Sequence, residues 1–280
     1  MEEMEIDLNA LLDDRNEEKE KKSRIIGHFW ASEFGKCHRQ VYYSFTCPQE
    51  HAADRRRVFD VGNLIHAHIQ ALLKKREGSD YLNVWNEKYV TINDIDTPLI
   101  ITGKIDTVLV PKLGEPFILE FKSVNERAFK KKVSVQYSHR CQTILYLRSQ
   151  QMSHGYVVYI SKDDMRVNML RVDYDEELFQ RLIREARYLL SCLQQCKLPS
   201  NQPKFPFECS YCPYQKNCKN NDNPALHARL FPAGGEAAKS IEPVKQEEVK
   251  PDAIRSEGNQ KDDLSGVYEG DDLHDKPEVS

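Results

Sequence analysis

The spacing of apolar residues changes along the chain, and the changes predict where helices and strands lie. Apolar residues recur every three or four positions in one stretch, which predicts a helix over about residues 54–77. Its core-facing residues are expected to be Val58, Val61, Ile65, Ile69 and Leu72. Further helices are predicted over about residues 32–43, 134–150 and 175–196.

Runs rich in Ile, Val and Thr, bounded by turn residues, predict strands between these helices. They cover about residues 82–92, 99–110, 116–122, 155–160 and 166–172. Strands interleaved with amphipathic helices indicate an α/β protein with a central mixed β-sheet flanked by helices.

The two ends of the chain differ in composition from its middle. Residues 1–20 carry nine acids and two bases, and residues 233–280 carry thirteen acids and six bases. Residues 21–232 carry 32 bases and 22 acids, a net charge of +10, which favours a polyanionic partner. We therefore expect an acidic extension over residues 1–24, one globular domain over residues 25–232 and a disordered acidic tail over residues 233–280.

The amino terminus is acidic and lacks an apolar signal core, and no stretch approaches the roughly 20 apolar residues of a membrane span. These features predict a cytoplasmic protein without a membrane partner. In a reducing compartment, the eight cysteines are expected to be metal ligands or packed thiols rather than disulfides.

One predicted hairpin carries charged residues in an apolar setting. Asp106 lies on its first strand, and Glu120 and Lys122 lie on its second. Glu120 and Lys122 are two residues apart and therefore project from the same face of a strand. Hard oxygen ligands such as these carboxylates and the Phe121 carbonyl suit Mg²⁺ or Mn²⁺, and Lys122 can act on a nucleophilic water. The hairpin therefore predicts a hydrolytic metal site.

Polar residues on two predicted helices extend this pattern. His66 would add a nitrogen ligand that favours Mn²⁺, although a lone helical histidine is more often a packed or exposed residue. His139, Gln142 and Tyr146 share one face of the helix over residues 134–150. A basic run, Arg127 to Lys132, follows the hairpin and is either a solvated loop or a phosphate contact.

The order of these motifs resembles that of RecB-like PD-(D/E)XK nucleases. The matching segments are Gly62-Asn63-Leu64-Ile65-His66, Gly103-Lys104-Ile105-Asp106, Glu120-Phe121-Lys122 and Gln142-Thr143-Ile144-Leu145-Tyr146. The resemblance implies a restriction-endonuclease-like core in which His66, Asp106 and Glu120 bind metal. It also implies that Lys122 is catalytic and that Gln142 and Tyr146 support the site and contact DNA.

Three cysteines form a compact metal-binding pattern, Cys209-x₂-Cys212-x₅-Cys218. Spacing alone allows Zn²⁺ or an iron–sulfur cluster and favours zinc, the commoner structural metal. The segment Cys37-His38-Arg39-Gln40-Val41-Tyr42-Tyr43 is similar to the Cys-Pro-Arg-x-x-Tyr motif of the iron–sulfur branch of these nucleases, apart from His38. That similarity implies a [4Fe-4S] cluster that joins the two ends of the domain. The other four cysteines, Cys47, Cys141, Cys192 and Cys196, are expected to pack, and Cys47 is the main competitor of Cys37 as the fourth ligand.

Together, the motifs resemble the Cas-four-type CRISPR-associated exonucleases and their phage and plasmid relatives. This resemblance implies a metal-dependent exonuclease that prefers single-stranded DNA ends, in a bacterial, archaeal or phage-infected cell. Its roles would be CRISPR spacer acquisition or phage and plasmid recombination and repair, with integrase or recombination proteins as partners. The alternatives are a catalytically silent DNA-binding adaptor with the same fold and a zinc-binding protein that uses only the cysteines.

Overall fold

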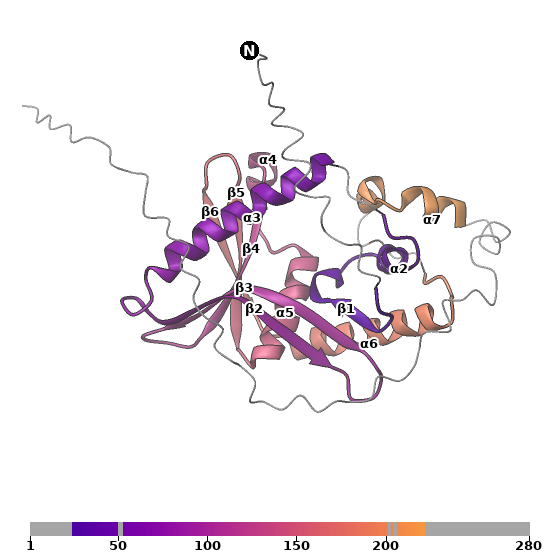
Figure 1. Cartoon of the computed structure of the whole chain (residues 1–280), viewed down its shortest axis with the longest axis horizontal. Coiled ribbons are helices and arrows are strands. Elements are labelled where there is room, and N and C mark those ends of the chain that lie inside the picture. The colour runs from indigo at the N-terminus through magenta and orange to yellow at the C-terminus, as the bar shows by residue number, and fades with distance from the viewer. Residues whose placement is uncertain (1–23, 50–52, 201–202, 204–205, 222–280) are drawn as a thin grey trace, which may run out of the picture. The chain divides into compact units, whose positions relative to one another are not determined.

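The computed structural model describes residues 24–49, 53–200, 203 and 206–221 (Figure 1). Within them, a six-stranded mixed sheet is flanked by helices, which confirms the predicted α/β class. The strands are β1 (His28–Trp30), β2 (Tyr81–Asn93), β3 (Ile100–Pro111), β4 (Phe117–Val124), β5 (His154–Ser161) and β6 (Val167–Asp173). The helices are η1 (Ala31–Glu33), α2 (His38–Thr46), α3 (Ala53–Lys74), α4 (Glu126–Phe129), α5 (Tyr137–Gln150), α6 (Glu176–Gln194), η2 (Pro206–Tyr211) and α7 (Gln215–Asn221).

Strand β3 organises the sheet. Antiparallel β2 pairs with one edge of β3 along almost its whole length. On the other edge, β1 pairs with β3 in parallel up to Thr102, and β4 pairs with it in antiparallel fashion from Thr107. Strand β5 then pairs in parallel with β4, and β6 closes the sheet antiparallel to β5. Among the described residues, no strand pairs with Gly103–Asp106 on the β4 side, so β3 and β4 form a fork there.

The two faces of the sheet are covered unequally. Helices α5 and α6 pack on one face and build the larger hydrophobic core. Helix α3 lies across the other face, where Ile65 packs on a smaller cluster that includes Leu119 and Phe121 (Figure 1). The last described segment packs against α2, where the ring centroid of Tyr214 lies 5.7 Å from that of Tyr43.

The predicted helix over residues 32–43 is wrong in its first half. Residues 31–33 form a single 3₁₀ turn, and α2 begins only at His38, with Cys37 at its N-cap. Gly35 separates them at φ +75°, a left-handed conformation that favours glycine. A Cβ there would also lie 2.8 Å from the Ser138 Cα, so α5 packs directly against this turn.

The predicted core face of α3 is also partly wrong. Ile65 is buried as expected, but Val58, Val61 and Leu72 are exposed. The cause is the small cluster beneath α3, which covers a narrow stripe of the helix. Cys196, expected to pack, is exposed at φ 52°, whereas Cys141 and Cys192 are buried.

The five predicted strands, the helix over residues 175–196 and most of the helix over residues 134–150 are confirmed within a few residues. Strand β1 and helix α4 were not predicted. The expectations for residues 1–23 and 233–280 lie outside the described residues. In the described part of the chain, no helix has the length and apolar character to cross a bilayer.

Candidate active site

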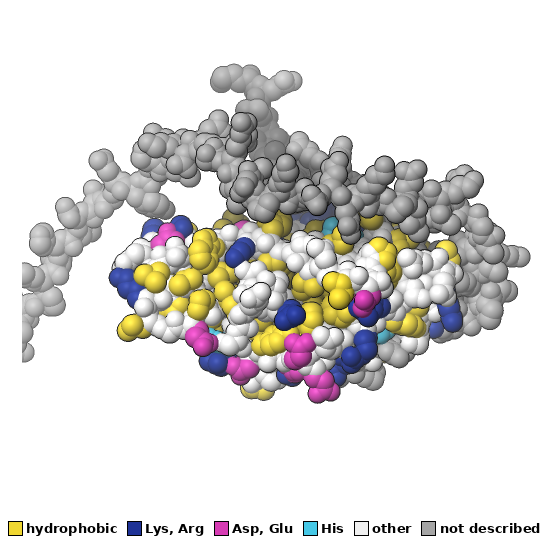
Figure 2. Space-filling view, turned by 90° about the horizontal axis from the view of Figure 1, so that it is seen from below, with side chains coloured by type: hydrophobic (Ala, Val, Ile, Leu, Met, Phe, Trp, Pro, Cys, Tyr) yellow, Lys and Arg dark blue, Asp and Glu magenta, His cyan; other side chains and the backbone are white. Residues whose placement is uncertain are grey.

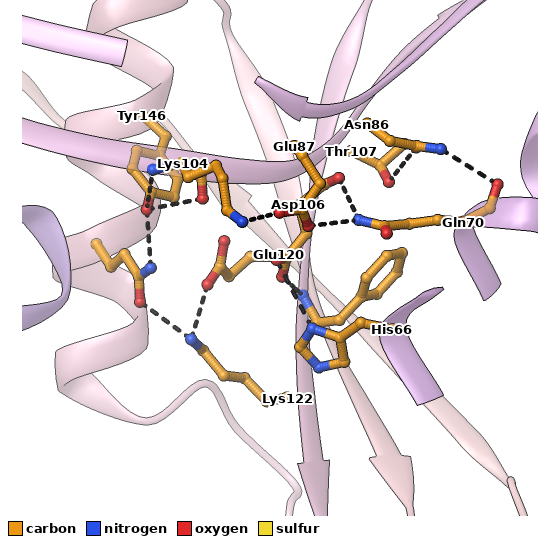
Figure 3. A network of polar contacts seen from close by, with 12 residues as sticks. His66, Gln70, Asn86, Glu87, Lys104, Asp106, Thr107, Glu120, Lys122 and Tyr146 are labelled. Atoms are coloured by element: carbon orange, nitrogen blue, oxygen red, sulfur yellow. Dashed lines mark hydrogen bonds and ion pairs between the residues drawn. The ribbon is translucent and has the colours of Figure 1, made fainter. Parts of the chain in front are cut away.

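The fork between β3 and β4 opens into a cleft of about 640 Å³. Side chains reach it from β1, α3, β2, β3, β4 and α5 (Figure 3). The cleft brings together all seven residues that the sequence analysis assigns to the active site, namely His66, Asp106, Glu120, Phe121, Lys122, Gln142 and Tyr146. Residues from four separate segments therefore converge where the sheet's backbone pairing is interrupted.

The hairpin supplies the centre of this cleft. The Phe121 backbone N–H donates to Asp106 Oδ2 at 2.7 Å, so the Asp106 side chain bridges the fork where the ladder has opened. Glu120 is 3% exposed. The Lys122 Nζ donates to Glu120 Oε1 at 2.7 Å and to Gln142 Oε1 at 3.0 Å. The predicted shared face of Glu120 and Lys122 is therefore confirmed.

Burial and neighbouring charges raise the pKa values of both Glu120 and Lys122. Burial, together with the nearby Asp106 charge, raises the pKa of Glu120 to about 8. Burial opposes the charge on Lys122, but the adjacent Glu120 carboxylate outweighs it and raises the Lys122 pKa. The cleft thus holds a carboxylate that is costly to ionise unless a positive charge lies beside it.

Helix α5 supports the fork through a chain of hydrogen bonds. Gln142 Nε2 donates to the Tyr146 hydroxyl at 3.0 Å, and that hydroxyl donates to the Lys104 carbonyl at 3.2 Å. The Lys104 N–H in turn donates to the Tyr146 oxygen at 3.3 Å. The hydroxyl therefore satisfies backbone groups that a neighbouring strand would otherwise pair. Gly103 is needed here because a Cβ would lie 2.5 Å from Tyr146 Cε1.

Two buried atoms at the fork lack a hydrogen-bond partner among the described residues: His66 Nε2 and Glu120 Oε2. His66 Nδ1 lies 3.7 Å from Asp106 Oδ1, which is longer than a hydrogen bond. Unsatisfied buried polar atoms are rare and often indicate an ion or water site. The donor set, one imidazole and two carboxylates, fits a divalent cation.

This donor set is not arranged as a finished metal centre. Within the described ranges, no three His, Cys, Asp or Glu side chains are grouped to hold a metal ion. The reason lies in the competing bonds, since Lys122 occupies one oxygen of Glu120 and the Phe121 N–H occupies one oxygen of Asp106.

Two further polar residues of the cleft, Gln70 and Glu87, were missed by the sequence reasoning. Gln70 Nε2 donates to the Asp106 carbonyl at 2.7 Å and to Glu87 Oε1 at 2.9 Å. Glu87 also pairs with the Lys104 ammonium. The available signal was Gln70 itself, a polar residue four positions after His66 on a helix with an apolar stripe.

His139 does not join Gln142 and Tyr146 in the cleft. Its Nδ1 lies 2.9 Å from the Tyr159 hydroxyl. Burial, reinforced by the Lys122 charge, lowers the His139 pKa to about 3, so the imidazole is neutral at physiological pH. Within the basic run, Lys130 pairs with Glu126 at 2.8 Å in a largely exposed setting.

Three of the predicted cluster ligands, Cys37, Cys209 and Cys218, lie near enough to Cys212 to influence its thiol, but among the described residues no three of the four are grouped to hold a metal ion. Burial raises the pKa of the Cys212 thiol, and the neighbouring Cys37, Cys209 and Cys218 raise it further. Arg39 Nη1 lies 3.4 Å from Cys218 Sγ, which connects α2 to α7. Cys47, the competitor, instead packs at the edge of the core.

Residues 80–219, half of the chain, match the PD-(D/E)XK nuclease superfamily. The chain belongs to this superfamily. The match includes Asp106, Glu120, Lys122 and the three carboxy-terminal cysteines, whereas His66 and Cys37 precede it. No curated protein matches the sequence.

Solved structures are similar to this chain at low sequence identity. The crystal structure of SSO0001 is 21% identical, with a TM-score of 0.52 over 74% of this chain and 91% of that one. An alkaline exonuclease from Laribacter hongkongensis is 15% identical, with a TM-score of 0.45 over 71% and 96% of the two chains. A phage-related exonuclease from Haemophilus somnus is 13% identical, with a TM-score of 0.40 over 57% and 80%.

Proposed function

We propose that this protein is a metal-dependent DNA exonuclease whose active site is the fork between β3 and β4. The observation that carries the proposal is the pair of buried, unpartnered atoms, His66 Nε2 and Glu120 Oε2, beside the Asp106 carboxylate. Membership of a nuclease superfamily supports the reaction class. The Lys122 ammonium binds only Oε1 of Glu120, so a divalent cation at Oε2 would complete the compensation of this buried carboxylate.

Mn²⁺ or Mg²⁺ would be held by His66, Asp106, Glu120 and the Phe121 carbonyl. When bound, such an ion activates a water and neutralises charge on the phosphate undergoing hydrolysis. His66 favours Mn²⁺, because imidazole is a softer ligand than the oxygens that Mg²⁺ prefers.

Lys122 is the catalytic residue of the protein itself. Its ammonium lies beside Glu120 and faces the cleft, where it can orient a water or stabilise developing negative charge. Gln142 restrains Lys122 through its side-chain oxygen, and Tyr146 restrains Gln142 through its hydroxyl. Gln142 and Tyr146 therefore position Lys122 and the β3 backbone.

The proposed substrate is single-stranded DNA with a free end. The net charge of +10 over residues 21–232 favours a nucleic-acid partner. The resemblance to Cas-four-type enzymes supports a role in CRISPR spacer acquisition or in phage and plasmid recombination and repair, with an integrase or recombination protein as partner.

We further propose a [4Fe-4S] cluster held by Cys37, Cys209, Cys212 and Cys218. The 3.4 Å contact of Arg39 Nη1 on α2 with Cys218 Sγ on α7, and the influence of Cys37, Cys209 and Cys218 on the Cys212 pKa, support a common site. Such a cluster would connect α2 to η2 and α7. Anaerobically purified protein should contain iron and sulfide, and Cys212→Ser should lose them. Cys196→Ser, which removes an exposed thiol, is the matched control. Zinc in place of iron would reject the cluster.

End-labelled single-stranded DNA tests the nuclease. Wild-type protein with Mn²⁺ should shorten the strand, and Lys122→Ala should lower the rate by at least about a hundredfold. Lys75→Ala removes an equal charge from the exposed end of α3 and should cleave normally. Binding without cleavage under Mn²⁺ and Mg²⁺ would reject the enzyme and favour the DNA-binding adaptor.

A further inference from the structure

Two exposed aromatic rings lie on the strands that flank β3 at the fork. Trp30 on β1 is 49% exposed, and Tyr89 on β2 is 77% exposed. Trp30 is in register with Thr102, and Tyr89 is in register with Lys104, two residues further along β3. Thr102 and Lys104 project from the same face of β3 and both line the cleft. The strand spacing places the two aromatic residues roughly 10–12 Å apart.

The Trp30 side chain is held in place from its inner side. The His28 ring stacks on it, with centroids 5.9 Å apart and an interplanar angle of 26°. His28 Nε2 lies within 3.0 Å of Thr102 Oγ1, so the stacked pair is connected to β3. The backbone N–H of Trp30 donates to the Glu33 carboxylate. Both terminal guanidinium nitrogens of Arg24 donate to the same carboxylate. A ring braced in this way binds a ligand with little loss of side-chain entropy.

Tyr89 lies beside a cationic group that also reaches the cleft. The Lys104 ammonium is 6.0 Å from the Tyr89 ring centroid and pairs with Glu87. The Lys104 and Glu87 side chains are 43% and 41% exposed, so this ion pair contributes little stability and can be exchanged for a phosphate contact.

Two exposed aromatic rings, Trp30 and Tyr89, lie on either side of the Lys104 cation beside the cleft. This combination suits the binding of single-stranded DNA. Bases stack on aromatic side chains, and basic residues contact the backbone. Figure 2 shows the face seen from below, where basic and acidic side chains are intermixed along the rim, so positive charge is not gathered there. The row formed by Trp30, Lys104 and Tyr89 combines aromatic rings with a cation that lines the cleft.

We propose that Trp30 and Tyr89 are base-stacking residues that lead a single DNA strand into the cleft, with Lys104 contacting a phosphate. This inference rests on the proposed nuclease function and deepens it. It also supplies a reason for a single-strand preference, because the faces of the bases are covered in a duplex and open in a single strand.

Trp30 is its own reporter. The chain has two tryptophans, Trp30 and Trp85, so Trp85→Phe leaves Trp30 as the sole indole. In the Trp85→Phe/Lys122→Ala protein, which does not cleave, a short oligothymidylate should quench the fluorescence. A blunt duplex at the same concentration should quench it much less.

Substitution then measures the contribution of each ring in the Lys122→Ala background. Trp30→Ala and Tyr89→Ala should each weaken binding of the oligothymidylate about tenfold or more. Trp85→Ala is the matched control, since Trp85 is 44% exposed but pairs with Val108, four residues beyond Lys104 on β3, and binding should be unchanged. Circular dichroism of each variant is the control for correct folding.

The outcomes separate this inference from the nuclease proposal. Wild-type cleavage with no Trp30 quenching and undiminished binding by Trp30→Ala overturns the stacking role and leaves the nuclease intact. Quenching by single strands in a protein that never cleaves supports the stacking role and rejects the nuclease. Equal quenching by duplex and single strand overturns the proposed strand preference.

Discussion

Helices α5 and α3 both bring side chains to the fork, but they are held very differently. All seven residues from Cys141 to Leu147 on α5 are buried, because α6, η1 and the sheet surround the helix. On α3, whose burial is described from Arg56 onward, the buried residues form a narrow stripe that includes Ile65, and Leu64 next to it is 70% exposed. The α5 side of the site is therefore packed on all its faces, whereas the α3 side contacts the sheet through one narrow stripe of residues.

The difference corresponds to the two tasks that the site requires. Gln142 and Tyr146 restrain Lys122 and the β3 backbone, which demands a rigid support. His66 lies 3.7 Å from Asp106 without a hydrogen bond between them. We infer that α3 adjusts when a cation is bound, while α5 does not.

Core truncation should show the largest contrast between the helices. Leu145→Ala on α5 removes a fully buried side chain and should lower the free energy of unfolding by about 2–5 kcal/mol. Leu64→Ala on α3 should change it by less than about 0.5 kcal/mol. Urea denaturation of both variants measures the difference. Similar losses would mean that α3 is as tightly packed as α5.

Adding one methyl group at the two glycines probes the same contrast at the fork. In Gly103→Ala, the new Cβ lies 2.5 Å from the Tyr146 ring, which is buried and cannot move away. We expect a loss of about 1–3 kcal/mol in unfolding free energy and about a hundredfold slower DNA cleavage.

Gly62→Ala on α3 is the matched substitution. Its Cβ meets only the Ser123 hydroxyl, at 2.9 Å, and a hydroxyl can rotate. Alanine also favours the helix by up to about 1 kcal/mol, so the stability should change by less than that amount in either direction. A larger loss at Gly62 than at Gly103 would reverse the assignment of the rigid and adjustable halves.

An ion pair between Asp94 and Arg187 joins the end of β2 to α6, and its contribution to stability depends on pH. Asp94, after β2, accepts hydrogen bonds from Arg187 on α6 at 2.5 and 2.8 Å, and these bonds hold the pKa of its nearly buried carboxyl below the usual value. A lowered folded-state pKa stabilises above the unfolded pKa of about 3.9, and the contribution is lost as the pH falls through the folded value.

Asp94→Asn should therefore cost about 2 kcal/mol at neutral pH. The difference from wild type should stay constant down to about pH 4 and shrink only below it. Asp173→Asn removes the exposed partner of Arg171 and should have almost no effect. A difference for Asp94→Asn that already disappears near pH 6 would contradict this account.

The hairpin was predictable because its signals are local. Strand alternation and the turn between Pro111 and Pro116 place Asp106 opposite Glu120 without knowledge of other elements. The fork itself was not predictable, since it depends on β1 pairing up to Thr102 and β4 pairing from Thr107. A three-residue strand such as β1 carries too short a pattern to be recognised.

The errors have a common physical origin in tertiary contacts. The spacing of Val61 and Leu72 predicts a helix but cannot say how wide a surface lies beneath it. The break before His38 arises from close packing of Gly35 on α5, far away in the sequence. Gln70 and Trp30 gain their importance from partners on other strands, and local patterns do not reveal these.

Metal binding at the fork, measured by electron paramagnetic resonance of Mn²⁺, tests the central claim most directly. Wild-type protein should bind Mn²⁺, His66→Ala should weaken this binding at least about tenfold, and Tyr146→Phe should leave it nearly unchanged because its hydroxyl contacts the β3 backbone and Gln142 instead. Wild-type protein that binds no Mn²⁺, or His66→Ala that binds it as tightly as wild type, would contradict a metal site assembled between α3 and the hairpin.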